Sequence, residues 1–264
     1  MFESFFDLPL AVAGPVIILS LCLFAVVGLV LVRRRLLPRL RVVTADSEFT
    51  GAMLQSVMVF YGLAVALIAV TVFQTHSDTS KVVTGEATAL NALYRDVSSY
   101  PEPIRLELQN ELRDYTDQVI HQAWPMQRRG EIPTAGIEHM SRFQAVLDRF
   151  EPASEGQKLL HGETLRAYNL LIQARRLRLD AVTTGLPAVM WAVIVAGAFI
   201  GLSASFFFKV EDARLHSIEA LLLAVFIGLV IFMIVALDRP FRGDLGVRAD
   251  PYQLVYDQLM KQGP

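Results

Sequence analysis

The sequence predicts an all-α membrane protein in which four transmembrane helices carry a polar helical bundle, inserted between the second and third spans. The first observation behind this prediction is that charge is missing from long stretches of a chain of 264 residues that is 53% hydrophobic. These stretches are Leu8–Val32, Phe49–Thr75, Ala181–Phe208 and Ala220–Leu237. Because about 20 apolar residues cross the hydrocarbon core of a bilayer as a helix, each stretch is close to a span in length or longer. A water-soluble enzyme is therefore excluded.

The second observation is the helical spacing of apolar residues between the second and third spans. They recur three and four positions apart in three sets, which are Leu108, Leu112, Tyr115 and Val119; Met140, Phe143, Leu147 and Phe150; and Leu165, Tyr168, Ile172 and Leu179. The third observation is that this region contains no alternating run of β-branched residues. We expect helices near 80–99, 103–124, 134–150 and 156–180 that close a small bundle.

The predicted organisation has four consecutive parts. Residues 1–75 hold the first two spans and a short basic loop, residues 76–180 form the polar bundle, residues 181–237 hold the last two spans, and residues 238–264 form a tail. The basic loop carries Arg33, Arg34, Arg35, Arg39 and Arg41. Short loops rich in arginine stay in the cytoplasm, so this loop favours an outside N-terminus and an extracytoplasmic bundle.

Two helices of the bundle have no evident break from the spans beside them. No proline occurs from Phe49 to Tyr100, and none occurs from Ala153 to Leu186. We therefore expect two long rods that join the membrane part to the polar bundle, with a kink near Gln74–Ser80 as the alternative for the first of them.

One face of the second span combines a polar entrance with small and aromatic side chains. The residues on this face are Gln55, Gly62, Ala66, Ala69 and Phe73. Such a face is a candidate wall for a conduit gated by apolar side chains. No charged residue lies in the middle of a span, which argues against a proton-coupled pump or a voltage sensor.

Small residues also recur at four-residue spacing in the other spans. They are Gly197, Gly201 and Ser205 in the third span, and Ala220, Ala224 and Gly228 in the fourth. Such stripes let helix backbones approach closely, either within one chain or between subunits.

A carboxylate interrupts the apolar stripe of the first bundle helix. Glu86 stands where the period places an apolar side chain, and Arg175 stands in a similar position on the last bundle helix, next to Arg176. Because a buried carboxylate needs a partner, we expect Glu86 to pair with Arg175 or Arg176 across the bundle. The pair would fix the helix register; an ion-selective or gating role is the alternative.

The end of the last span carries a compact motif at the predicted membrane interface. It consists of Asp238, Arg239, Pro240, Phe241 and Gly243. Proline stops the helix here and glycine permits a turn, so we expect an interfacial cap. The tail beyond it has an apolar helical stripe that docks either on the bundle or on the membrane surface.

Motifs of enzymes and of metal or cofactor sites are absent from the sequence. The five histidines form no HExxH pair and no ligand set with the single cysteine, and no phosphate-binding or dinucleotide-binding glycine loop occurs. A net charge of −2 gives no reason to expect nucleic acid. We expect no catalytic residue, no metal and no cofactor; the expected partners are the lipid bilayer, ions and further copies of the chain.

Five short segments, taken together and in order, resemble the bestrophin-like family of bacterial membrane proteins. They are Gly85–Asp96, Trp124-Pro125-Met126, Arg175–Leu179, Leu186-Pro187 followed by Trp191, and Leu237–Phe241 followed by Gly243. The resemblance covers roughly Phe49 to Tyr252. One departure is Ala123, where the family pattern has a glutamate, and this leaves no carboxylate for a role at that position.

The resemblance implies a homo-oligomeric ion channel, pentameric in bestrophins, whose second span lines the pore. It also implies a multi-pass protein of the bacterial inner membrane with a cytosolic bundle, opposite to the side that the loop charges favour, so both orientations stay open. The conducted ion is not predicted, although the arginine clusters Arg33–Arg41 and Arg175–Arg178 favour anions. The alternative function is a membrane-anchored sensor or scaffold whose bundle binds a partner.

Overall fold

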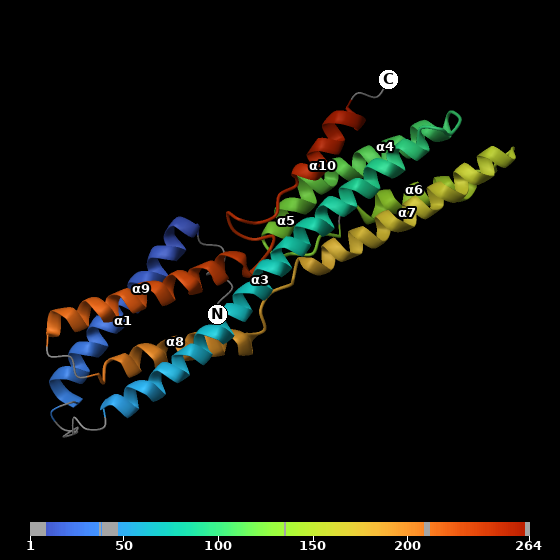
Figure 1. The fold of residues 1–264 in the computed structure, drawn as a ribbon. Coiled ribbons are helices and arrows are strands. Elements are labelled where there is room, and N and C mark those ends of the chain that lie inside the picture. The colour runs from blue at the N-terminus through green and yellow to red at the C-terminus, as the bar shows by residue number, and fades with distance from the viewer. Residues whose placement is uncertain (1–8, 37, 39–46, 135, 209–211, 262–264) are drawn as a thin grey trace. The chain divides into compact units, whose positions relative to one another are not determined.

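The computed structural model is mostly helical in the part of the chain that it describes, which comprises residues 9–36, 38, 47–134, 136–208 and 212–261. No strand occurs among these residues, and the all-α prediction is confirmed. Arg39 and Arg41 of the predicted basic loop lie outside the described residues. The helices carry the labels of Figure 1.

The chain folds into two compact units. One unit, called the membrane unit below, comprises Met1–Gln74 and Gly185–Asp238, and the other, called the polar unit, comprises Thr75–Thr184 and Arg239–Pro264. The C-terminal segment therefore belongs to the polar unit. Of the two places considered for the tail, the structure selects docking on the bundle.

The membrane unit contains the four predicted spans. These are α1 (Leu10–Leu31, continued by a π-helical turn over Val32–Leu36), the first part of α3 (Ser47–Val97), α8 (Ala188–Ser205) and α9 (Ala213–Asp238). Each has an 18-residue window with a mean hydropathy between 2.0 and 3.2, so each is long and apolar enough to cross a membrane. The last span begins at Ala213, seven positions before the uncharged stretch predicted from Ala220.

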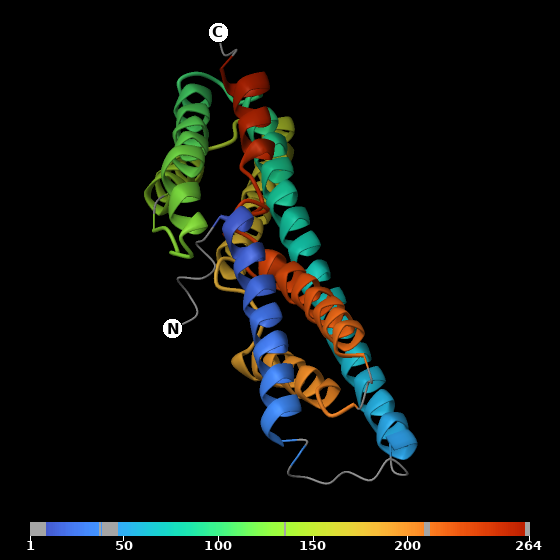
Figure 2. The same ribbon diagram turned by 90° about the vertical axis from the view of Figure 1, so that its left-hand side faces the viewer.

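Helices α1 and α9 pack against each other in antiparallel directions through small residues (Figure 2). A Cβ atom added to Gly14 of α1 would lie 3.2 Å from the ring of Phe232, and one added to Gly228 of α9 would lie 3.2 Å from the Cα atom of Ile18. Ala224 of α9 is fully buried in the same seam. The small stripe of the fourth span thus serves packing within the chain.

Helix α3 contacts α8 through the small stripe of the third span. The hydroxyl of Tyr61 donates a hydrogen bond of 2.8 Å to the carbonyl of Ile194. The ring of Tyr61 covers Gly197 so closely that an added Cβ would lie 2.2 Å from it, and Met58 covers Gly201 in the same way. This second stripe is also used within the chain, which was one of its two predicted uses.

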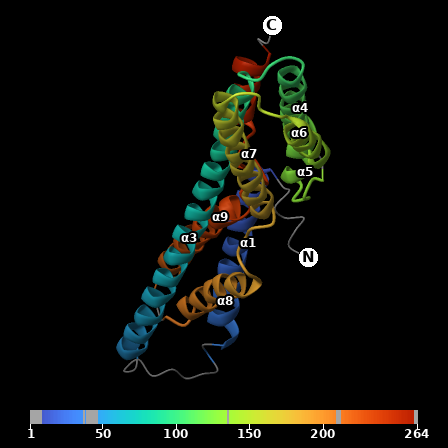
Figure 3. The same ribbon diagram turned by 90° about the vertical axis from the view of Figure 1, so that its right-hand side faces the viewer.

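The first of the two expected rods is confirmed, and the second is wrong. Helix α3 is assigned without interruption over 51 residues (Figure 3), so the helix does not break near Gln74–Ser80. In contrast, α7 (Glu155–Ala181) ends before α8 begins at Ala188. Proline disfavours the helical conformation of the residue before it, and Gly185 and Pro187 fall in this gap.

The polar unit is built on the second part of α3 and on α7. Around them lie α4 (Ile104–Gln118), which continues through a π-helical turn (Val119–Ala123) into α5 (Trp124–Arg128), then α6 (Ile137–Arg149), and α10 (Asp250–Val255) with a final π-helical turn (Tyr256–Met260). Leu108, Leu112 and Phe143 of the predicted apolar stripes are fully buried in its core. On α7 the buried residues are Tyr168 and Leu171, whereas Leu165 and Ile172 of the predicted stripe are only partly buried.

Candidate functional site

The predicted wall of the second span lies mostly on an exposed face of α3. Gln55, Gly62, Ala66 and Phe73 are exposed, and Ala69 is half-buried. In the most apolar 18-residue window of α3, 11% of the window is buried. The corresponding share is 22% in α1 and α8, and 28% in α9. The second span is therefore the least covered by its own chain, and most of its surface is left for lipid, water or another copy.

The space around the glycines of the membrane unit shows which small-residue stripes are covered by a neighbouring helix. An added Cβ at Gly197 or Gly228 would meet a neighbouring helix, whereas an added Cβ at Gly62 would meet nothing within 4 Å. Two of the three small-residue stripes are thus used for packing inside the chain. The stripe on α3 is open at Gly62 and Ala66, whereas Ala69 packs partly against the core of the membrane unit.

A second exposed face of α3 was missed by the sequence reasoning. Phe60, Leu63 and Leu67 are 71%, 57% and 61% exposed. At 3.6 residues per turn, Phe60 points about 140° away from Phe73 around the helix. Bulky apolar residues are ordinary on a lipid-facing surface, so hydrophobicity alone gave no signal that separates the two faces.

Beyond the membrane unit, α3 carries the one carboxylate that was expected to be buried. Glu86 has 0% exposure, and its carboxylate accepts two hydrogen bonds from Arg178 of α7. The Arg178 Nε atom lies 2.7 Å from Oε2, and Nη2 lies 3.2 Å from Oε1. The hydroxyl of Tyr115 on α4 donates a third bond of 2.6 Å to Oε1. The carboxylate therefore ties three helices together.

The partner of Glu86 corrects the sequence-based expectation. Arg178 holds the carboxylate, instead of Arg175 or Arg176 as expected. Arg178 lies one helical turn beyond Arg175, so it shares the inward face of α7, whereas Arg176 points to solvent and is exposed. The periodicity identified the correct face of the helix but not the turn that stands opposite Glu86.

Aromatic rings enclose the Arg178 guanidinium. Its Cζ atom lies 5.9 Å from the centre of the Trp124 ring and 5.8 Å from that of Tyr252. Burial is the largest single influence on the pKa of Arg178 and lowers it, but Glu86 together with Tyr252 and Tyr115 raises this pKa well above its ordinary value. Burial, reinforced by the charge of Glu86, raises the pKa of the Tyr115 and Tyr252 hydroxyls far above 10. The guanidinium therefore stays ionised and the two tyrosine hydroxyls stay protonated.

The motif at the end of the fourth span is divided between the two units. In the membrane unit, Asp238 is buried and accepts hydrogen bonds from the backbone N–H of Leu186 at 2.6 Å and from the indole N–H of Trp191 at 3.3 Å. The carboxylate therefore fastens the start of α8 to the end of α9. This position agrees with a capping role.

The other motif residues belong to the polar unit. Arg239 donates to the carbonyl of Thr183 at 3.1 Å, and Phe241 is 1% exposed with its ring 5.6 Å from that of Trp124. Pro240 accepts a hydrogen bond from the backbone N–H of Val247, and Gly243 has a φ angle of 71°, which suits glycine. The residues form a turn that places Phe241 in the core.

No group of three or more potential metal ligands lies together among the described residues. The sites therefore consist of an open helix face in the membrane unit and a buried, closed charge cluster in the polar unit.

A comparison with protein-family models matches the bestrophin-like domain over residues 20–252. The chain belongs to the bestrophin-like family. Among solved structures, a bacterial bestrophin homologue from Klebsiella pneumoniae carrying a point mutation shares the fold, with a TM-score of 0.66 over 95% of this chain and 99% of that chain. The sequences are 12% identical, so this likeness shows the fold alone. No curated protein matches.

Within this bestrophin-like chain, several of the residues that carry the family resemblance are buried. Glu86, Trp124, Asp238 and Phe241 lie within the matched range and have 5% exposure or less. They fasten helices to one another. The exposed face of α3 lies in the same range but is made of residue types common in any span, and its role therefore needs a separate argument.

Proposed function

We propose that the protein is a homo-oligomeric ion channel of the bacterial inner membrane in which the α3 spans of several copies line the pore. The observation that carries the proposal is that α3 is the least buried of the four spans while its small-residue stripe is open. A helix with one face on its own chain and an uncovered face is suited to surround an axis shared with other copies. Membership of the bestrophin-like family supports the same assignment.

The proposed wall consists of Gln55, Gly62, Ala66, Ala69 and Phe73. Small side chains leave width for an ion, and Phe73 supplies an apolar constriction that gates by dewetting. Arg33, Arg34 and Arg35 follow α1 directly in a π-helical turn, and their positive charge favours anions near the membrane edge. Five copies per ring follow from the family resemblance alone, and native mass spectrometry of the purified oligomer would count them.

The function is tested by ion flux into liposomes that contain the purified protein. The matched pair of variants is Phe73→Ala and Phe60→Ala, because both residues are phenylalanines on α3 with 62% and 71% exposure. If the predicted face lines the pore, Phe73→Ala raises the flux by widening an apolar constriction, and Phe60→Ala leaves it unchanged. The reverse outcome assigns the pore to the opposite face of α3.

A folded oligomer that passes no ion would contradict the channel assignment and favour a sensor or scaffold. The continuous helix α3 fits that alternative, because it carries a span and also contributes to the polar unit. For the orientation, cysteine labelling at Glu107 and Arg39 in a Cys22→Ser background shows which side of the membrane holds the polar unit.

A further inference from the structure

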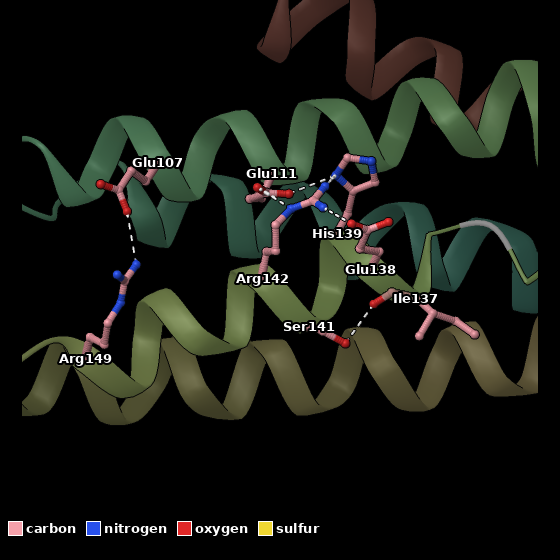
Figure 4. A network of polar contacts seen from close by, with 8 residues as sticks. All are labelled: Glu107, Glu111, Ile137, Glu138, His139, Ser141, Arg142 and Arg149. Atoms are coloured by element: carbon pink, nitrogen blue, oxygen red, sulfur yellow. Dashed lines mark hydrogen bonds and ion pairs between the residues drawn. The ribbon is translucent and has the colours of Figure 1, made fainter.

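A polar cluster on the edge of the α4–α6 seam has no part in the proposed pore. Glu111 of α4 faces His139 and Arg142 of α6, and Glu138 lies beside Arg142 (Figure 4). We call these four residues the seam cluster. The side chains of His139 and Glu111 are 18% and 19% exposed, so water screens their interaction only in part.

Two neighbours compete for the same nitrogen of His139. Its Nδ1 atom lies 2.8 Å from Oε2 of Glu111 and 2.8 Å from Nη2 of Arg142. Arg142 also places Nε 2.9 Å from the other oxygen of Glu111 and Nη1 2.6 Å from Oε1 of Glu138. The guanidinium therefore contacts every other member of the cluster.

The ring nitrogen can form a hydrogen bond with Arg142 or with Glu111, but not with both at once. A guanidinium only donates hydrogen bonds and a carboxylate only accepts them, whereas a ring nitrogen does one or the other. When Nδ1 carries no proton, its lone pair accepts from Arg142, which is a contact within α6. When Nδ1 carries a proton, it donates to Glu111, which is a contact between α6 and α4. Only one of these bonds exists at a time.

Charges of both signs surround His139. Glu111 and Glu138 bring two negative charges and Arg142 brings one positive charge, so the cluster is negative while the imidazole is neutral. Glu107 and Arg149, the next pair along the seam, lie 3.4 Å apart and compensate each other. One proton on the imidazole makes the cluster neutral, and histidine ordinarily changes its charge between pH 5 and 8.

We propose that His139 is a proton-responsive switch of the α4–α6 seam. A proton from water binds the Nδ1 lone pair, the hydrogen bond from Arg142 breaks, and a charge-assisted hydrogen bond to Glu111 forms. Because the new bond joins two helices and the lost bond joined one helix to itself, the seam is more tightly closed at acid pH. Arg142 keeps Nε on Glu111 and Nη1 on Glu138, because the bond that breaks involves its Nη2 atom alone.

Hydrogen exchange of the full chain in detergent tests the switch without depending on ion conduction. Peptides covering residues 104–118 and 137–149 are followed between pH 5.5 and 8, with rates corrected for the intrinsic pH dependence of exchange. We expect the corrected exchange of these peptides to slow by roughly threefold to tenfold on acidification. Corrected rates that do not change with pH would overturn the proposal.

Variants separate the switch from a general effect of pH. His139→Gln removes the response. His121→Gln, the matched control, keeps it, since exposed His121 pairs at 3.0 Å with Asp117 one turn before it and joins no two helices. A response that survives His139→Gln would assign the effect elsewhere.

Two further variants keep the proposal testable if His139→Gln does not fold. Glu111→Gln removes the negative acceptor and moves the midpoint of the response to lower pH, whereas Arg142→Met removes the competing cation and moves it to higher pH. Each shift is on the order of 1 pH unit. Shifts in the same direction would refute the competition for Nδ1.

Discussion

The buried pair of Glu86 and Arg178 makes a sharp prediction about stability. Arg178→Met replaces the guanidinium with an uncharged side chain of similar length. Glu86, with 0% exposure, then keeps its carboxylate in the core of the polar unit, where the hydroxyl of Tyr115 is its remaining hydrogen-bond donor among the contacts described above. An uncompensated buried charge is among the largest single penalties to folding.

The size of the penalty follows from what the structure buries. Two hydrogen bonds of 2.7 and 3.2 Å are lost, together with the contacts of the guanidinium on the rings of Trp124 and Tyr252. Removing one partner of such a buried pair costs about 3–5 kcal/mol. For a folding unit of this size the loss corresponds to a fall in Tm of roughly 10–20 °C.

Two further variants show whether the charge causes the loss. Arg176→Met, on the exposed side of the same helix, is expected to change stability by less than about 0.5 kcal/mol. Glu86→Gln combined with Arg178→Met removes both charges, and most of the lost stability is expected to return because a buried pair replaced as a whole is often neutral. The double variant should therefore be more stable than the single variant Arg178→Met.

The assay uses the position of the two tryptophans of the chain. Trp124 lies against Arg178 in the polar unit, and Trp191 lies in the membrane unit. In a Trp191→Phe background, thermal unfolding followed by Trp124 emission reports on the polar unit alone, and the cost of the background substitution cancels between variants. A loss below about 1 kcal/mol for Arg178→Met, or a double variant no better than the single one, would refute the reasoning.

Three further predictions concern packing, the membrane-unit carboxylate and alkaline pH. Gly197→Ala places a Cβ 2.2 Å from the ring of Tyr61 and should lower stability by about 1–3 kcal/mol in thermal unfolding. Gly62→Ala meets nothing within 4 Å and should be neutral or slightly stabilising. Equal losses for the two variants would contradict the open face of α3. Asp238→Asn leaves one acceptor oxygen for two N–H donors and should cost about 1.5–3 kcal/mol, checked by unfolding in the same detergent. Burial raises the pKa of Tyr115, so above about pH 10 the unfolded chain releases a tyrosine proton that the native chain retains. The free energy of unfolding should therefore fall as pH rises, and Tyr115→Phe should make this fall less steep. An equally steep fall in the variant would contradict the reasoning.

The spans and the bundle helices could be predicted because their signals are local. An uncharged stretch such as Phe49–Thr75 requires lipid or protein around it wherever it lies, and the period of Leu108, Leu112 and Tyr115 fixes one buried face. The same logic marked Glu86 as a buried carboxylate in need of a partner. These properties belong to single helices and do not depend on what the rest of the chain does.

The end of α7 shows where local reasoning became incomplete. Pro187 lies inside the third uncharged stretch, yet the absence of proline before it predicts a helix that continues from the bundle into the span. The break is instead spread over the residues between Ala181 and Ala188. In the membrane unit the amide of Leu186 in this break is bound by Asp238, which lies 52 positions away in the sequence. No pattern near Leu186 reveals that acceptor.

Local patterns in the sequence were enough to predict the helical class, the four spans, the need of Glu86 for a cation and the family. Tertiary structure alone decided that Arg178 is that cation, that Gly197 and Gly228 are covered while Gly62 is open, and that the tail packs into the polar unit. The physical reason is that periodicity fixes which face of a helix avoids water, whereas a partner depends on the rotation and register of two helices that meet only in the folded chain.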